Sequence, residues 1–305
     1  MTLPPFLSPG DRVAFAAPAR KIMPSELQPA INLLQSWGLQ PVVPDHLYDS
    51  YHQFAGPDSI RTALMQQLLD DPDIKAIFCV RGGYGTVRII DNLDFSHFAQ
   101  HPKWIVGYSD ITVLHSHIQQ NLGIATLHAT MPIDIEANHL LSPTPALQSL
   151  HSALFGKNLC HTLHSHPFNR PGSCRAPLTG GNLSILYSLS GSASDISTEG
   201  KILFIEDLDE YLYHIDRMML NLKRSGHLAD LAALIVGQLN QMHDNTIPFG
   251  RTAEEIVLDV VSTYNYPVCF NFPSGHIGPD NRALILGQEA HLIVGDEVQL
   301  HFLPK

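Results

Sequence analysis

The stretch Trp104-Ile105-Val106-Gly107-Tyr108-Ser109-Asp110 leads directly into a helical-looking segment from Ile111 to Leu122. Its first half is a continuous apolar run, which is typical of a strand buried on both faces of a parallel sheet. The change from strand to helix predicts a sharp turn, on which the hydroxyl of Ser109 projects towards the first N–H groups of the helix. The stretch therefore predicts a βα unit that presents a candidate nucleophile. The alternative is a serine N-cap on an ordinary αβ unit.

Further strand and helix candidates alternate on both sides of this unit. Such alternation of apolar runs with helical segments is typical of a parallel sheet that is covered on both faces. The strand candidates are residues 12–16, 40–43, 76–80 and 124–127, and the helix candidates are residues 25–37, 59–69, 86–92 and 144–154. We therefore expect an N-terminal α/β domain with a flavodoxin-like parallel sheet over residues 1–155.

The composition changes between residues 156 and 176, where His, Pro, Ser and Arg dominate without periodicity. This is typical of an interdomain connection, so we expect a linker there. Beyond it, helix and short strand candidates predict a second α/β domain over residues 177–305. The helix candidates are 182–189, 212–225 and 252–264, and the strand candidates are 201–205, 232–237, 268–271, 283–286, 291–294 and 297–302. A chain of 305 residues also exceeds the usual size of one core.

Two strand candidates of the second domain end in residues that can activate a serine. The run 201–205 ends in Glu206-Asp207-Leu208-Asp209-Glu210, and the run 267–272 is followed by Pro273-Ser274-Gly275-His276. A serine hydroxyl needs a base, and the base needs an acceptor on its other nitrogen. Because α/β proteins gather reactive groups at the carboxyl ends of strands, Ser109, an acid and His276 can form a triad across the domain interface.

Several short motifs span nearly the whole chain: Pro9-Gly10-Asp11-Arg12-Val13, Ala16-Ala17-Pro18, Arg81-Gly82-Gly83-Tyr84-Gly85, Gly107-Tyr108-Ser109-Asp110, Leu178-Thr179-Gly180-Gly181-Asn182-Leu183, Ile205-Glu206-Asp207 and Gly275-His276. On these motifs the chain resembles the LD-carboxypeptidases, serine peptidases of bacterial murein recycling that include the microcin-immunity peptidases. The resemblance implies that Ser109 is the nucleophile, His276 the general base and Glu206 the residue that orients the imidazole. One departure is His128-Ala129-Thr130-Met131-Pro132, which stands where a His-Gly-Pro-like turn is expected.

The resemblance also implies an activity. We expect a cytoplasmic, homodimeric hydrolase of peptidoglycan recycling in the bacterial cell wall, which releases terminal D-alanine from murein tetrapeptide by cleaving an L,D-peptide bond. One alternative is a microcin-immunity-like serine amidase that acts on peptidyl or aminoacyl nucleotides. Another is a catalytically silent α/β binding protein, against which the presence of Ser109, Glu206 and His276 weighs.

Residues around the glycine turn can complete the site. Glycines 82 and 83 let backbone N–H groups approach a ligand closely, so we expect Gly83 N–H and Asp110 N–H to bind the oxyanion, with Gly82 as the alternative to Gly83. A carboxypeptidase must also bind a free carboxylate, which arginine does through its forked donors. Arg81 is the first candidate, and the alternatives are Arg88 and Arg217.

The remaining acids and Asn182 have structural interpretations. Asp207 competes with Glu206 for the orienting role, whereas Asp209 and Glu210 are interpreted as the charged first turn of the helix that follows. Asn182 is interpreted as a helix cap.

Charge and composition exclude several functions. The formal net charge of −11 disfavours nucleic acids and anionic membranes as partners, because both reward clustered Lys and Arg. The first ten residues have neither a positively charged region nor a continuous apolar run, so we expect no secretory leader. No stretch approaches the roughly 18 apolar residues of a membrane span, so we also expect no such span. The histidine-rich stretch from Cys160 to His166 has neither a zinc-site spacing nor nearby acids. We therefore expect no metal and no cofactor.

Overall fold

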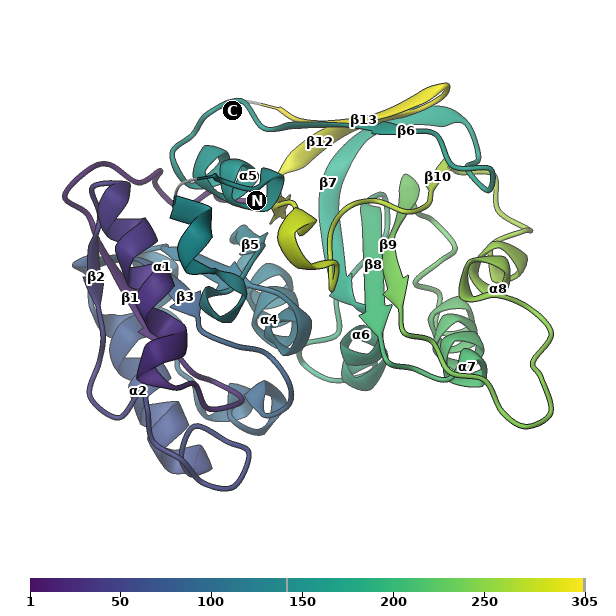
Figure 1. Cartoon of the computed structure of the whole chain (residues 1–305). Helices are drawn as coiled ribbons and strands as arrows, with labels where there is room; N and C mark the ends of the chain where they lie inside the picture. Colours follow the sequence, from purple (N-terminus) through teal and green to yellow (C-terminus); the bar gives the residue numbers. More distant parts are fainter. Residues whose placement is uncertain (141, 304–305) are drawn as a thin grey trace.

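In the computed structural model, which describes residues 1–140 and 142–303, the first half of the chain builds an α/β lobe around a parallel sheet (Figure 1). Its strands β1 (Arg12–Ala16), β2 (Gln40–Val42), β3 (Ile74–Cys79), β4 (Trp104–Gly107) and β5 (Thr126–His128) lie in the order β5-β4-β3-β1-β2. This is the 2-1-3-4-5 order of flavodoxin-like folds, so the expected fold class is confirmed. We call this part the first lobe.

The helices of the first lobe are α1 (Pro24–Ser36), α2 (Asp58–Asp70), α3 (Ser96–Gln100), α4 (Thr112–Leu122) and α5 (Pro145–Leu154). Helix α1 shows why such segments dock, because its buried residues Leu27, Ala30, Leu33 and Leu34 recur at helical spacing on one face. The helix expected over 86–92 is instead two 3₁₀ turns, Thr86–Arg88 and Ile90–Asn92. Four of its residues, at positions 86, 87, 89 and 90, are β-branched and favour the α-helix less.

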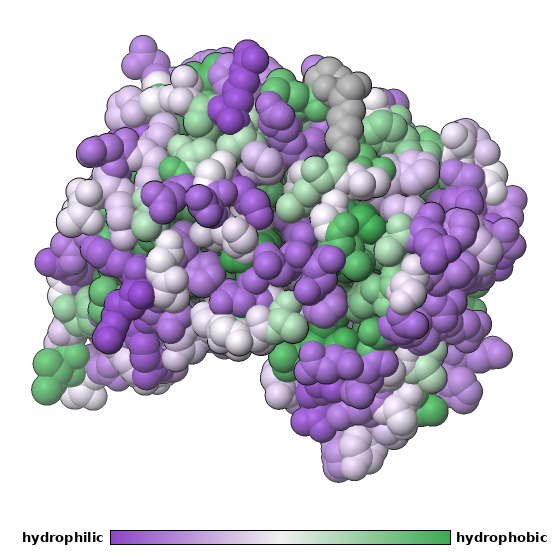
Figure 2. All heavy atoms as spheres, turned by 180° about the vertical axis from the view of Figure 1, so that it is seen from behind, coloured by the Kyte–Doolittle hydropathy of each residue, from purple (hydrophilic) through white to green (hydrophobic). Residues whose placement is uncertain are grey.

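The second lobe is built on a sheet with the order β10-β9-β8-β7-β12-β13-β6. Its parallel half comprises β7 (Gly172–Asn182), β8 (Ile202–Leu208), β9 (Ala233–Asn240) and β10 (Val268–Cys269), and its antiparallel half adds β6 (Cys160–His164), β12 (Glu289–Val294) and β13 (Glu297–Phe302). Its helices are α6 (Leu183–Leu189), α7 (Leu212–Arg224) and α8 (Ala253–Val260). Seen from behind, a notch separates the two lobes, and hydrophilic residues cover much of the surface (Figure 2).

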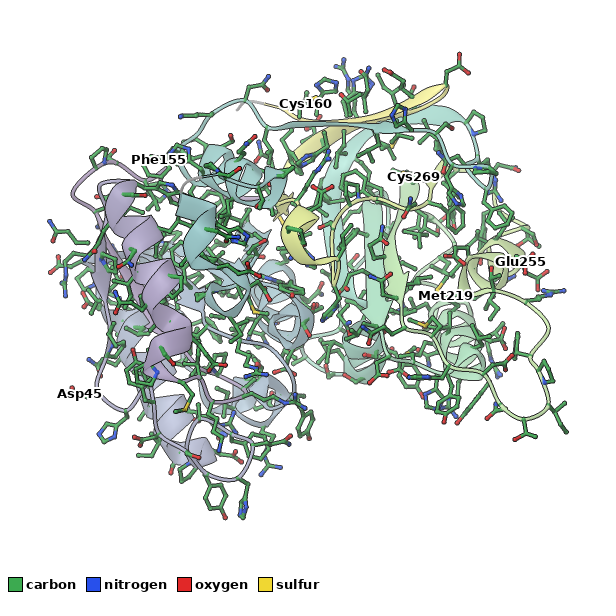
Figure 3. The ribbon with its side chains drawn as sticks, in the orientation of Figure 1. Asp45, Phe155, Cys160, Met219, Glu255 and Cys269 are labelled. Carbon is green, nitrogen blue, oxygen red and sulfur yellow. The ribbon has the colours of Figure 1, made fainter. Side chains whose placement is uncertain are left out.

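The prediction of an irregular linker over residues 156–176 is wrong. The segment contains β6 and the beginning of β7, and Cys160 lies on the outer strand of the second sheet (Figure 3). Buried and exposed side chains alternate along β6, with His161 and Leu163 turned towards the interior. His161 Nε2 bonds to the Ala283 carbonyl at 2.9 Å. Because one of the inward residues is a histidine, the alternation does not appear as a pattern of apolar and polar residues, and hydrophobicity alone does not predict the strand.

The two lobes share elements. Strand β11 (Leu284–Leu286), from near the C-terminus, pairs antiparallel with β5 of the first sheet. The division into residues 1–155 and 177–305 therefore stays a prediction, and residues 304 and 305 of the second range lie outside the described residues. Across the described chain, no helix is both long and apolar enough to cross a bilayer.

Helix α4 forms a large part of the contact between the lobes, because it packs against β7 and α6. The Asn182 N–H donates to Thr112 Oγ1 at 3.0 Å, and Thr179 Oγ1 lies 3.1 Å from Gln119 Oε1. All four residues are buried. Since α4 follows Ser109 directly, these buried bonds fix the position of the serine relative to the second sheet.

Candidate active site

Ser109 lies on a strained turn between β4 and the helical segment that follows. Its backbone φ is +63°, a left-handed conformation that is uncommon for a residue with a side chain. A short 3₁₀ turn, Ser109–Ile111, leads from there into α4. The predicted sharp turn is thus confirmed, and strain of this kind is concentrated at functional sites.

The glycine turn after β3 lies against this serine. A Cβ on Gly82 would be 2.9 Å from Ser109 Cβ, 3.1 Å from its Oγ and 3.5 Å from Asp110 N. Only glycine fits at such a distance without displacing the serine. The close approach brings the turn, the serine and the start of the helix together.

Glu206 and His276 meet at the carboxyl end of the second sheet. Glu206 is fully buried on β8, at a shift in the pairing register with β9, and its Oε2 accepts a 2.7 Å bond from His276 Nδ1. This bond fixes the tautomer and leaves Nε2 as the proton acceptor. Burial lowers the pKa of His276, but the charge and hydrogen bond of Glu206, together with the charges of Asp207 and Asp134, outweigh burial, so that the pKa is raised above 6.5. A Cβ on Gly275 would lie 2.7 Å from Glu206 Oε2, so this contact requires glycine.

A cavity of about 490 Å³ at the lobe interface contains both Ser109 and His276. The ring of Tyr108, next to the serine, contacts the His276 ring edge-on with centroids 4.9 Å apart. Among the described residues no hydrogen bond joins Ser109 Oγ to His276 Nε2. Such bonds are often long before a substrate binds, so the geometry is compatible with a triad that tightens later.

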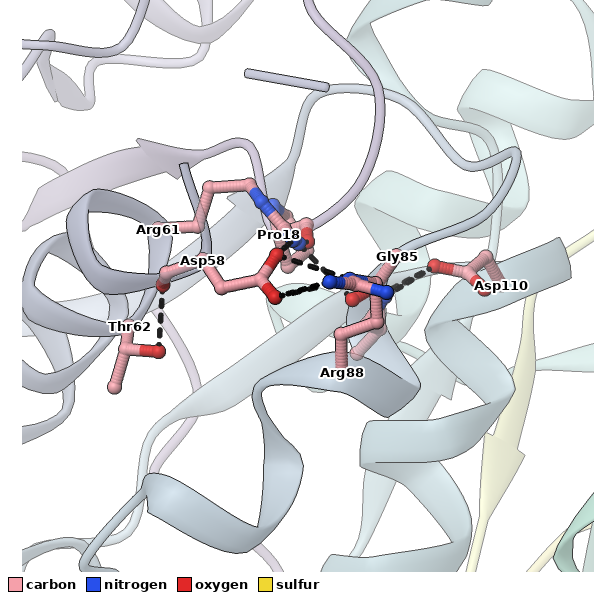
Figure 4. Close-up of polar contacts among 8 residues, drawn as sticks. Pro18, Asp58, Arg61, Thr62, Gly85, Arg88 and Asp110 are labelled. Carbon is pink, nitrogen blue, oxygen red and sulfur yellow. Dashed lines mark hydrogen bonds and ion pairs between the residues drawn. The ribbon is translucent and has the colours of Figure 1, made fainter. Parts of the chain in front are cut away.

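The predicted oxyanion donors lie where the serine meets the glycine turn. Within residues 1–140 and 142–303, the N–H groups of Gly82, Gly83 and Asp110 donate to no protein acceptor. The Asp110 carboxylate accepts from Thr86 N–H at 2.9 Å and from Thr86 Oγ1 at 2.6 Å, which ties the glycine turn to the serine turn. Buried Arg61 supports the other side of the glycine turn, because it donates to the Gly85 carbonyl at 2.9 Å (Figure 4).

The candidate carboxylate-binding arginines separate clearly. Arg81 lines the cavity, as does Arg20, which sequence reasoning missed. Arg88 is bound to Asp58 by three bonds of 2.7 to 3.1 Å (Figure 4), and Arg217 stacks over the Tyr213 ring at 5.5 Å. The last two arginines do not line the cavity. Arg20 lies after the carboxyl end of β1. The rule that reactive groups gather at the carboxyl ends of strands, which we call the strand-end rule, therefore applies to Arg20 as it does to Ser109.

The acids that follow Glu206 have different surroundings. Asp207 accepts from Asn182 Nδ2 at 3.0 Å and from Ser184 N–H at 2.8 Å, so it anchors the start of α6 and not His276. Burial and the neighbouring Glu206 raise the pKa of Asp207 to about 7. Asn182 is the cap of α6, as predicted. The interpretation of Asp209 and Glu210 as a first helical turn is wrong, because α7 begins only at Leu212 and both acids line the cavity.

Two further cavity residues escaped the sequence reasoning. Tyr108 and Asp134 line the cavity beside His276, and the Asp134 carboxylate lies close enough to influence the pKa of both Tyr108 and His276. Asp134 belongs to the 3₁₀ turn Pro132–Asp134, which carries no motif. In the part of the chain that the structure describes, no group of three His, Cys, Asp or Glu residues is arranged to hold a metal ion.

The sequence is similar to that of known proteins along most of the chain. A model of the LD-carboxypeptidase N-terminal domain matches residues 13–129, and a model of the LD-carboxypeptidase C-terminal domain matches residues 175–292. A probable murein peptide carboxypeptidase of Bacillus subtilis is 36% identical over 94% of this chain and 90% of the relative. The chain belongs to the LD-carboxypeptidase family. The expectation drawn from the motifs is thereby confirmed, and the protein is a peptidase.

Solved structures of LD-carboxypeptidase-like proteins share the fold. The crystal structure of muramoyltetrapeptide carboxypeptidase from Oxalobacter formigenes superposes with a TM-score of 0.84 at 27% identity, covering 96% of this chain and 99% of that one. The microcin C7 self-immunity protein MccF, in complex with aspartyl sulfamoyl adenosine, gives a TM-score of 0.86 at 22% identity over 100% and 99% of the two chains. The second likeness concerns the fold alone.

Proposed function

We propose that the protein is a serine-type LD-carboxypeptidase that releases terminal D-alanine from murein tetrapeptide. The observation that carries the proposal is the pairing in one cavity of Ser109, on its left-handed turn, with His276, whose Nδ1 is held by buried Glu206. The names of the murein-peptide relatives support the substrate. The setting would be peptidoglycan recycling in the bacterial cytoplasm, and by family resemblance the protein would be a homodimer.

The residues can perform the reaction in two steps. Ser109 Oγ attacks the carbonyl carbon of the third residue while His276 Nε2 takes the hydroxyl proton, and Glu206 stabilises the imidazolium. The N–H groups of Gly83 and Asp110 bind the oxyanion. The C–N bond then breaks, His276 returns the proton to the leaving D-alanine amine, and an ester remains on Ser109. Water, deprotonated by His276, hydrolyses this ester, releases the tripeptide and restores the serine.

Arg81 supplies the carboxylate recognition in this proposal. It lines the cavity beside the glycine turn and makes no ion pair in the described chain, so its forked donors are free for the terminal carboxylate. Arg20 lines the same cavity and can share this role.

Incubation of the protein with murein tetrapeptide, followed by assays for free D-alanine and for the tripeptide, tests the proposal. We expect both products in equal amounts. A tetrapeptide that ends in L-alanine is the matched control and should be cleaved much more slowly. Equal cleavage of the two, or no release of D-alanine, would contradict the proposal. The nucleotide-amidase alternative rests on a likeness of fold alone.

A further inference from the structure

A further cavity, of about 410 Å³, is distinct from the one that contains Ser109 and His276, and the two share no lining residue. It lies where β11 of the first sheet and β13 of the second meet the end of α5 and the N-terminal segment. Its apolar lining residues are Leu3, Phe6, Ala153, Leu159, Ile285 and Phe302. We call it the apolar cavity. A largely apolar cavity of this size is typical of a small-molecule site, and the proposed reaction uses none of its residues.

Gln288 brings an unpaired hydrogen-bond acceptor to the apolar cavity. Its side chain lines the cavity, and the residue is only 7% exposed. The Nε2 group donates to the Leu303 carbonyl at 2.7 Å, and because a carbonyl oxygen only accepts, this bond fixes which end of the amide is Oε1. Within residues 1–140 and 142–303, no donor reaches that Oε1 atom. A buried acceptor without a donor is unfavourable, so a ligand that supplies one should be bound selectively.

Lys157 brings a positive charge to the same cavity. It lines the cavity but is exposed, whereas Gln288 is buried, so the charge lies nearer the solvent than the amide. Lys157 forms no ion pair with any residue that the structure describes, and its ammonium group is therefore available to an anion. The rings of Phe6 and Phe302 also line the cavity, and aromatic rings pack favourably against one another. The cavity thus offers an apolar interior, one buried acceptor and one exposed cation.

We propose that the apolar cavity is a binding site for a small aromatic acid that carries a hydroxyl group on its ring. The hydroxyl group donates to Gln288 Oε1, the ring packs against the apolar wall, and the carboxylate lies near the Lys157 ammonium group. This site is separate from the proposed peptidase site and does not depend on it. Because the ligand contacts elements of both sheets and has no such site in the unfolded chain, its binding should also raise the Tm.

Three probes that differ by one group each test the inference on the full chain, with Kd measured by isothermal titration calorimetry. They are 3-(4-hydroxyphenyl)propionate, 3-phenylpropionate, which lacks the hydroxyl group, and 4-propylphenol, which lacks the carboxylate. We expect the hydroxy acid to bind about tenfold more tightly than 3-phenylpropionate, since only its hydroxyl group satisfies the buried acceptor. It should bind about two- to fivefold more tightly than 4-propylphenol, as for an exposed ion pair, and salt should reduce this second difference.

Substitutions assign each preference to its residue. Gln288→Met keeps a side chain of similar length without the acceptor, so it should weaken the hydroxy acid to the level of 3-phenylpropionate and leave 3-phenylpropionate unchanged. Lys157→Gln should remove the preference for the carboxylate alone. Lys75→Gln, at an exposed position on β3 that does not line the apolar cavity, is the matched control and should change none of the three affinities.

Three results would overturn the inference. The first is no measurable binding of the hydroxy acid at millimolar concentration. The second is equal affinity for the hydroxy acid and 3-phenylpropionate, which would mean that water satisfies Gln288. The third is a loss of affinity in Arg81→Gln but not in Lys157→Gln, which would place the acid in the cavity of Ser109. If Gln288→Met does not fold, the three probes on wild-type protein and Lys157→Gln still decide between these results.

Discussion

Two constellations of serine, histidine and acid can be compared among the residues that the structure describes, and they differ in their surroundings. One is Ser109 with the pair His276–Glu206. In the other, His227 lies 2.7 Å from Ser225 Oγ through Nδ1 and 2.8 Å from Asp195 Oδ1 through Nε2. The second set has the more complete hydrogen bonds, because the serine and histidine of the first are not yet bonded. Hydrogen-bond geometry alone would therefore favour Ser225 over Ser109, the serine that we propose as the nucleophile.

The position of each serine on its helix explains the difference. Ser109 precedes α4, where free N–H groups and the positive end of the helix dipole favour an oxyanion. Ser225 caps the C-terminus of α7, and its hydroxyl donates to the Asn221 carbonyl at 2.8 Å. Carbonyl groups and the negative end of the dipole would oppose an oxyanion there. A triad thus needs a stabilised charge as well as an activated nucleophile.

The largest expected effect separates the two serines. Ser109→Ala removes the nucleophile, so kcat for D-alanine release should fall by about 10⁴- to 10⁶-fold, as when a triad member is lost. Ser225→Ala removes a hydroxyl of the same kind and should leave kcat unchanged. Both variants are to be compared by circular dichroism to establish equal folding. Substantial activity in Ser109→Ala would end the assignment.

Substitution of the acid in each constellation should also affect kcat differently, but by a smaller factor than substitution of the serine. Glu206→Gln keeps the volume but removes the charge that stabilises the imidazolium, so kcat should fall by about 10³- to 10⁴-fold. Asp195→Asn, the equivalent change in the second constellation, should not affect kcat. Steady-state kinetics on folded protein measures both.

Asp207→Asn provides a control within the candidate site. Asp207 bonds to Asn182 and Ser184 and not to His276, so its loss should cost much less in kcat than Glu206→Gln. If the two variants showed the reverse effects with folding unchanged, Asp207 would be the acid of the triad.

The pH dependence of kcat/KM should shift with Glu206 and not with Asp195. His276 acts as a base only when neutral, and its pKa is raised above 6.5, so activity should fall as the pH drops through this raised value. Glu206→Gln removes the strongest of the causes that raise this pKa and leaves burial together with the weaker charges of Asp207 and Asp134, so the acidic limb should move to lower pH. An acidic limb at the same pH in wild type and Glu206→Gln would contradict this origin of the shift.

Chelation should have the smallest effect. The proposed reaction needs only side chains and backbone N–H groups, so prolonged treatment with a chelator should leave kcat unchanged. Loss of activity that returns only on addition of zinc would show that the account omits a metal.

The strand-end rule explains how much of the candidate site was predictable from the sequence. Ser109 and His276 each follow an apolar strand, and Glu206 follows the apolar run 202–205 within β8. The alternation of apolar runs also predicted the first sheet. The family motif favoured Glu206 over Asp207, and only the fold shows that Glu206 bonds to His276 while Asp207 bonds to Asn182 and Ser184. The ring contact of Tyr108 with His276, and the placement of Asp134 near enough to influence His276, arise only when the two lobes pack together.

Other features were missed because a distant partner creates them. Strand β6 buries His161 against the Ala283 carbonyl, so its polar sequence resembles a linker. Asp195 and His227 are likewise brought together only by the fold. Arg20, in contrast, lies four residues after the end of β1 and was open to prediction by the same rule as Ser109.

Trapping of the covalent intermediate tests the central claim most directly. Wild-type protein is mixed with excess murein tetrapeptide, quenched in acid within milliseconds, digested and examined by mass spectrometry for a tripeptide acyl group. The account predicts this group on the peptide that contains Ser109, and an unmodified peptide around Ser225. A tripeptide acyl group on Ser225, or on any residue other than Ser109, would contradict it.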